Sequence, residues 1–109
     1  MLRADVWWAA WPPGQRHPVL LLSWDSGRGR RTQVTVAEVT TTVRGHAQEV
    51  ALGLADGMPR DCVVNLDRLV TVPRPVLARR ITTLTVTRMD DVERAIHLAL
   101  GMRLPCRTS

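Results

Sequence analysis

Short runs of β-branched and apolar residues dominate the first two thirds of the chain, and Gly, Pro and Arg separate them. Such runs are typical of β-strands, because branched side chains pack well on a pleated surface. The run at 18–23 is apolar almost throughout, which is typical of a strand buried on both faces. Together the runs predict strands at residues 5–11, 18–23, 34–43, 48–52, 62–66 and 80–84.

The pattern changes near the C-terminus, where apolar residues recur at helical spacing. Met89, Val92, Ile96 and the pair 99–100 fall on one face of a helix. Thr85 can cap the start of this helix, and Gly101 can end it in a left-handed conformation. We therefore expect a mainly β fold in which a small, curled antiparallel sheet packs against one C-terminal α-helix.

The amino-acid composition indicates what kind of partner the chain binds. The chain has 15 basic and 10 acidic side chains, a net charge of +5, and every basic residue is arginine. Guanidinium groups are planar donors, suited to bidentate phosphate contacts and to stacking on bases. This excess of positive charge on a small chain indicates an anionic partner, either nucleic acid or an acidic peptide.

The length of 109 residues predicts one domain spanning residues 1–109. No apolar run approaches the ~20 residues of a transmembrane helix, and Asp5 interrupts the region where a signal peptide would be apolar. We therefore expect a cytoplasmic protein without membrane association. Cys62 and Cys106 lie far apart without a CxxC motif, which excludes a zinc ribbon and argues against a structural disulfide.

Four segments, taken in order, resemble the MazF/PemK family of toxin endoribonucleases from type II toxin–antitoxin modules. They are residues 6–9 (VWWA), 18–23 (PVLLLS), 36–45 (VAEVTTTVRG) and 61–67 (DCVVNLD). Each segment alone is a weak signal, but four in register followed by one helix are specific. The resemblance covers about residues 3–100 and implies a small SH3-like curled antiparallel barrel of the MazF/PemK/CcdB type.

The resemblance also implies an activity and partners. Members of the family form homodimers and cut single-stranded RNA at short sequences, without a metal or other cofactor. The ribose 2′-OH attacks the adjacent phosphorus and leaves a 2′,3′-cyclic phosphate and a 5′-OH. The expected partners are therefore single-stranded RNA (mRNA, tRNA or rRNA loops), a cognate acidic antitoxin and a second copy of the chain, but neither a membrane nor DNA.

The catalytic pair of the family is an Arg directly before the Pro of the second strand and a Thr at the end of the third. The Thr falls on Thr40, whereas the position before Pro18 is His17, and Arg16 lies one residue earlier. Arg stays protonated and stabilises phosphorane charge, whereas histidine, with an ordinary pKa near 6.5, transfers protons near neutrality. We expect Arg16 to be the indispensable charge with His17 assisting, and leave open that His17 takes the role directly.

Further residues are candidates for RNA contacts. The basic loop before residue 34 offers guanidinium planes and an indole for base stacking, although a short charge run is often only solvated. Thr42 shares a strand face with Thr40, and 67–68 match a stretch that lies near RNA in the family. The candidate set is Ser23, Trp24, Arg28, Arg30, Arg31, Thr42, Asp67 and Arg68. Trp7, Trp8 and Trp11 are interpreted as core or dimer contacts.

Two other functions fit the same pattern. A gyrase-inhibiting toxin family shares this barrel and acts through the C-terminal helix rather than through a groove at the rim. A degenerate RNA-binding module, inactive because His17 replaces the expected Arg, would bind RNA and leave it uncut. The segment around Pro18 and Thr40 favours the nuclease.

Overall fold

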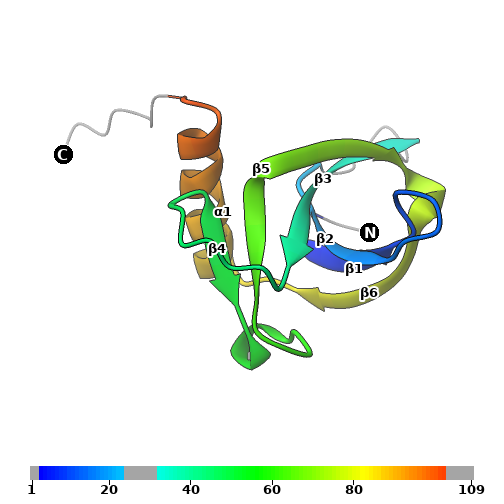
Figure 1. The fold of residues 1–109 in the computed structure, drawn as a ribbon, viewed down its shortest axis with the longest axis horizontal. Coiled ribbons are helices and arrows are strands. Elements are labelled where there is room, and N and C mark those ends of the chain that lie inside the picture. Colours follow the sequence, from blue (N-terminus) through cyan, green and yellow to red (C-terminus); the bar gives the residue numbers. More distant parts are fainter. Residues whose placement is uncertain (1–2, 24–31, 103–109) are drawn as a thin grey trace.

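The computed structural model describes residues 3–23 and 32–102 (Figure 1). Its strands, 3-10 turns and helix follow in the order β1 Asp5–Ala9, β2 His17–Leu21, β3 Gln33–Thr40, β4 Glu49–Leu52, η1 Leu54–Asp56, β5 Cys62–Pro73, η2 Arg74–Val76, β6 Leu77–Thr83 and α1 Val86–Ala99. Within the described residues no helix is long and apolar enough to cross a membrane.

The strands form one antiparallel sheet in the order β4-β5-β3-β2-β1-β6. The sheet curls strongly, so that β5, β3, β2, β1 and β6 surround a common interior, while α1 and β4 lie to one side of this ring (Figure 1). The sheet keeps two edges, at β4 and β6. The predicted mainly β fold, a curled barrel-like sheet with one C-terminal helix, is confirmed.

Strand β5 is the longest element of the sheet and bends in its middle. Residues 63–65 pair with both β3 and β4, Cys62 pairs with β4 alone, and residues 69–73 pair with β3 alone. Ala37 faces Leu69 whereas the next residue, Glu38, faces Asn65, so residues 66–68 form a bulge without partners in β3. A bulge bends the strand and re-aims its side chains, which lets β5 follow the curl.

The core has two parts because β2 is buried on both faces, as its apolar run predicted. Val19 and Leu21 point into the ring with Ala9, Val34, Val36, Val72 and Leu77. Leu20 points the other way, toward a second cluster that includes Val39, Val64, Leu66 and the helix residues Met89, Val92 and Ala95. Trp7 packs against the interior cluster. Alternate residues of one strand therefore hold the two parts together.

Several predicted boundaries were wrong. Strand β1 ends at Ala9 instead of residue 11, because Pro12 and Pro13 follow and proline cannot donate to a ladder. Strand β3 ends at Thr40 instead of residue 43, where the Thr42 N–H donates to Thr40 Oγ1 (3.1 Å) rather than to a neighbouring strand. Strand β5 extends to residue 73, and β6 begins at residue 77 instead of residue 80.

The helix caps agree with the prediction. Thr85 Oγ1 accepts a hydrogen bond from the Arg88 N–H (3.2 Å), and Gly101 follows the helix with φ +66°. The apolar face is buried at Met89 and Val92, and Ile96 and Ala99 pack against the core. Of the pair 99–100, Ala99 therefore belongs to this face, whereas Leu100 is 56 % exposed.

Polar contacts fix the turn around η1, which leads into the loop before β5. The Asp56 carboxylate accepts from the Gly53 N–H (3.0 Å) and from Arg88 Nε (3.0 Å), and the Asp56 carbonyl accepts from Thr82 Oγ1 (2.9 Å). The hydrogen bond to Asp56 raises the pKa of Arg88 above its ordinary value, so this contact always involves a charged guanidinium. Gly57 ends the turn at φ +86°.

Gly57 has no room for a side chain. A Cβ at this position would lie 2.9 Å from Thr82 Cβ and would collide with Thr82 Oγ1. We expect Gly57→Ala to lower the free energy of unfolding by about 1–3 kcal/mol more than Gly45→Ala does. Gly45 is the matched control, because it also has a positive φ (+76°) but nothing within 4 Å of a Cβ. Urea unfolding checks this, and equal losses for the two variants would contradict it.

Candidate active site

The pairing of β2 with β3 brings His17 and Thr40 together. The ladder pairs Val19 with Glu38, and continuing its register by two residues places His17 opposite Thr40. Directly opposed residues of an antiparallel pair share one face of the sheet. Both residues line one cavity of about 540 Å³, which we call the His17–Thr40 groove. Two of the three residues predicted to be catalytic thus face the same space.

The walls of the His17–Thr40 groove come from strands and from the loop before β5. The strand residues are Trp8, Pro18 and Val39, and Thr41 follows directly after β3. The loop contributes Met58, Pro59 and Arg60, and Cys62 lies at the start of β5. Burial raises the pKa of the Cys62 thiol, and the nearby Asp56 and Asp61 add to the effect. The thiol therefore stays protonated at neutral pH and forms a neutral part of the wall.

Arg60 is a groove residue that the sequence did not reveal. The pattern indicated only an irregular segment at 53–60, and a single arginine in such a segment carries no local signal. It is exposed at the groove, and within residues 3–23 and 32–102 no ion pair engages its guanidinium. It offers a positive charge on the side of the groove formed by the loop.

Arg16 lies at the rim of the groove rather than in its lining. Its guanidinium carbon stands 5.4 Å from the centroid of the Trp8 ring, the distance of a cation–π contact. Trp8 itself lines the groove, so the contact holds the arginine next to the space that His17 and Thr40 share. Arg16 is otherwise exposed to solvent.

Hydrogen bonds orient the two groove residues. His17 Nε2 lies 2.9 Å from Gln15 Oε1. An amide oxygen can only accept, so Nε2 is the donor in this contact and Nδ1 is the acceptor of the neutral ring. Thr40 Oγ1 accepts from the Thr42 N–H, which leaves the hydroxyl hydrogen of Thr40 available to donate to another group.

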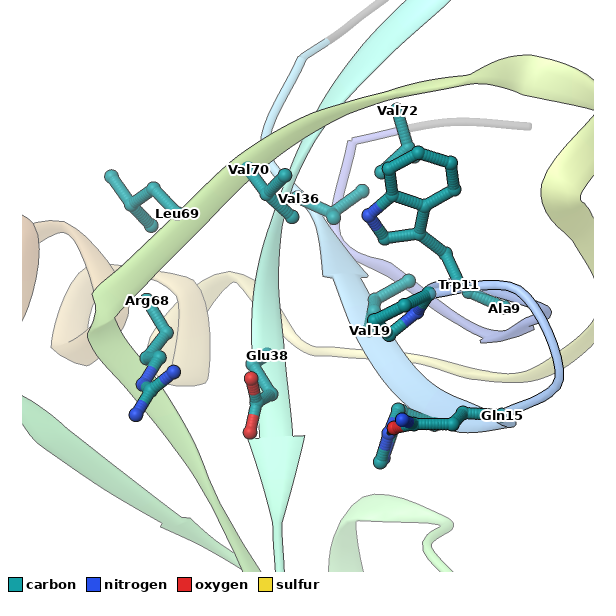
Figure 2. Close-up of a pocket in the computed structure, with 12 residues that line it drawn as sticks. Ala9, Trp11, Gln15, Val19, Val36, Glu38, Arg68, Leu69, Val70 and Val72 are labelled. Carbon is teal, nitrogen blue, oxygen red and sulfur yellow. The ribbon is translucent and has the colours of Figure 1, made fainter.

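A second cavity, of about 480 Å³, opens at the mouth of the curled sheet, and we call it the barrel-mouth pocket (Figure 2). His17 lines both cavities. Buried apolar residues form the floor of this pocket, and Gln15, Glu38 and Arg68 lie around it (Figure 2). The two cavities therefore meet at His17.

The remaining predicted RNA contacts are spread over the structure. Arg68 lines the barrel-mouth pocket, whereas Asp67 and Thr42 are exposed and line neither cavity described above. Ser23 follows β2 at the end opposite to His17, where its Oγ accepts from the Thr35 N–H (2.7 Å). Trp24, Arg28, Arg30 and Arg31 lie outside the described residues.

The described part of the chain holds no group of three or more His, Cys, Asp or Glu side chains with the arrangement of a metal site. The groove and its rim offer instead an imidazole, the hydroxyls of Thr40 and Thr41, the Cys62 thiol and two guanidinium groups. An imidazole transfers protons, and hydroxyl and guanidinium groups stabilise the negative charge of a phosphate.

Comparison with known proteins identifies the family of the chain. Residues 2–100 match the family model of the PemK-like, MazF-like toxin of type II toxin–antitoxin systems. The chain is 38 % identical to the probable endoribonuclease MazF2 of Mycobacterium tuberculosis over 102 residues, covering 93 % of this chain and 99 % of the relative. It is 40 % identical to the probable endoribonuclease MazF5 of the same organism over 105 residues, 95 % of this chain and 93 % of the relative.

Solved structures agree as well. The Mycobacterium tuberculosis toxin MazF-mt6 superposes with a TM-score of 0.82 at 33 % identity, over 92 % of this chain and 99 % of that one. An endoribonuclease in complex with its cognate antitoxin, from a mycobacterial species, gives a TM-score of 0.83 at 27 % identity. The match covers 96 % of this chain and 99 % of that one. The family model and the relatives span nearly the whole chain, so this protein belongs to the PemK-like, MazF-like family of type II toxins.

Proposed function

We propose that this chain is the toxin of a type II toxin–antitoxin module and an endoribonuclease that cuts single-stranded RNA in the His17–Thr40 groove. The observation that carries the proposal is the placement of His17 and Thr40 on facing strands in one cavity, with Arg16 at its rim. Relatives at 38–40 % identity that bear the name endoribonuclease support the activity. We propose the cytoplasm as its place of action, because the RNA that it would cut is found there.

The proposed reaction is a transesterification within the RNA. The ribose 2′-OH loses its proton and its oxygen bonds to the adjacent phosphorus, while the bond from phosphorus to the 5′-oxygen breaks. The leaving oxygen takes up a proton, and the products are a 2′,3′-cyclic phosphate and a 5′-OH end. The step needs a proton acceptor, a proton donor and stabilisation of the charge on the phosphorane.

The residues of the groove match these needs. His17 moves protons, since imidazole can both accept and donate a proton and this residue lines the groove. Arg16 stabilises the phosphorane, and its stacking on Trp8 holds the guanidinium near the reacting phosphate. Thr40 donates its free hydroxyl hydrogen to a phosphate oxygen. Arg60 adds positive charge from the opposite wall and binds the phosphate backbone.

Single-residue variants separate these roles. We expect Arg16→Ala to abolish cleavage at every pH, because no other group replaces the guanidinium at that point. His17→Ala should lower the cleavage rate by about a hundredfold or more, because proton transfer by the imidazole is lost. Thr40→Val should lower the rate by about tenfold, the effect of one lost hydrogen bond to the transition state.

The measurement is single-turnover cleavage of a fluorescent RNA between pH 5 and 9, with RNA affinity measured alongside. His17→Ala should keep most of the RNA affinity, since the imidazole acts in the chemical step. Addition of a metal chelator should leave the wild-type rate unchanged. Full activity of Arg16→Ala would contradict the assigned roles, and RNA that binds but stays uncut under all conditions would identify an inactive RNA-binding module.

We propose that an acidic antitoxin inhibits the chain by occupying the same groove. A complex of a similar endoribonuclease with its cognate antitoxin supports a partner of this kind, and the net charge of +5 favours an acidic segment. We expect the antitoxin encoded next to this chain to raise the apparent Kd for RNA in proportion to its concentration. Fluorescence anisotropy measures this, and a ternary complex with unchanged RNA affinity would contradict direct competition.

We propose a homodimer as the active form. A domain of this size gains stability by burying a second apolar surface, and Val86, Leu98, Leu100 and Met102 are exposed apolar residues of the kind that an interface covers. Sedimentation at micromolar concentration should give a mass near that of two chains. A mass near 12.2 kDa, that of one chain, would contradict the dimer.

A further inference from the structure

The barrel-mouth pocket is built differently from the groove in which cleavage is proposed. Its floor is apolar and fully within the interior cluster, formed by Ala9, Val19, Val36 and Val72. Trp11, 37 % exposed, and Val70, 38 % exposed, stand at its sides (Figure 2). A cavity with an apolar floor and an indole at its side suits a flat heterocycle, because bases stack on aromatic and apolar surfaces.

Two opposite charges lie beside this apolar floor, and local structure places them there. Glu38 sits at the point of β3 where the bulge in β5 begins, and Arg68 is the last residue of that bulge. Both side chains line the pocket (Figure 2). In the part of the chain that the structure describes, no hydrogen bond or ion pair engages the Glu38 carboxylate or the Arg68 guanidinium.

A carboxylate in this position cannot bind the RNA backbone. Like charges repel, so Glu38 beside a polyanion is unfavourable unless it accepts hydrogen bonds from a base. Guanine is the base that offers two adjacent donors to a carboxylate, N1–H and the N2 amino group. On its other edge it offers the acceptors O6 and N7, which a guanidinium binds in bidentate fashion. Adenine and cytosine each offer one exocyclic amino group, and uracil offers one imide N–H between two carbonyls.

We propose that the barrel-mouth pocket binds a guanine base of the RNA substrate, with Glu38 accepting from N1–H and the N2 amino group and Arg68 donating to O6 and N7. Trp11 stacks against the face of the base. Because His17 lines both cavities, the guanine belongs to a nucleotide next to the phosphate that is cut. The inference rests on the proposed ribonuclease function and assigns part of its sequence specificity.

The first test uses the full chain and an RNA library with randomised sequence, and maps the 5′-OH ends. The wild type should require guanine at one fixed position beside the cut, by about ten- to a hundredfold over the other bases. Glu38→Gln and Arg68→Ala should still cut RNA but lose most of that preference. Glu93→Gln is the matched control, since it makes the same chemical change on the exposed face of α1, and should keep the preference.

The second test measures binding without cleavage. Uncleavable 2′-O-methyl heptanucleotides carry guanosine or inosine at the centre and random bases elsewhere. Inosine differs from guanosine only by the missing N2 amino group. The wild type should therefore bind the inosine oligonucleotide several-fold more weakly than the guanosine one, whereas Glu38→Gln should bind the two with equal affinity. Thermal unfolding of each variant shows that it is folded.

The outcomes separate this inference from the proposed function. Cleavage by the wild type without any guanine requirement, or a preference retained in Glu38→Gln, would overturn the guanine pocket and leave the ribonuclease intact. If the wild type cuts no RNA, the proposed function fails. In that case the binding test alone decides whether the barrel-mouth pocket binds guanine. Equal affinities of the wild type for the guanosine and inosine oligonucleotides would overturn that assignment.

Discussion

The antiparallel pairing of β2 with β3 is the constraint on which both the core and the candidate site depend. Val19 and Leu21 of β2 fill the ring, and Leu20 between them packs toward the helix, so the strand is buried on both faces. A slip of one residue would reverse every side chain to the other face. Each cluster is packed for its own side chains, so such an exchange would overfill one cluster or leave a cavity in the other, at a cost of about 1–3 kcal/mol per site. The core thus fixes the register, and the register sets His17 opposite Thr40.

The bulge in β5 has a comparable effect on the second cavity. Residues 66–68 stand out of register with β3, and the strand turns there to follow the curl of the sheet. The same bend carries Arg68 to the mouth of the ring near Glu38, while Leu66 remains fully buried on the helix side. One irregularity of the backbone therefore shapes the barrel and creates a charged pocket beside the groove.

Elements with a strong local pattern could be predicted from the sequence. The apolar run at 18–23 indicated a doubly buried strand, and Thr85 and Gly101 marked the limits of the helix by their own conformational preferences. The second half of β5 could not be predicted, because most of its side chains are exposed and its pairing with β3 joins segments far apart in the sequence. Glu38 and Arg60 were missed for the same reason: each is one charged residue without a motif, and only long-range contacts give it a place in a cavity.

The central claim is that RNA is cut where His17 and Thr40 face each other. A crystal structure of the chain with a 2′-O-methyl RNA that spans a mapped cleavage site tests it most directly. The account predicts the scissile phosphate within hydrogen-bond distance of Thr40 Oγ1, with the His17 ring beside the blocked 2′-oxygen. RNA bound along the exposed face of α1, with the groove empty, would contradict it.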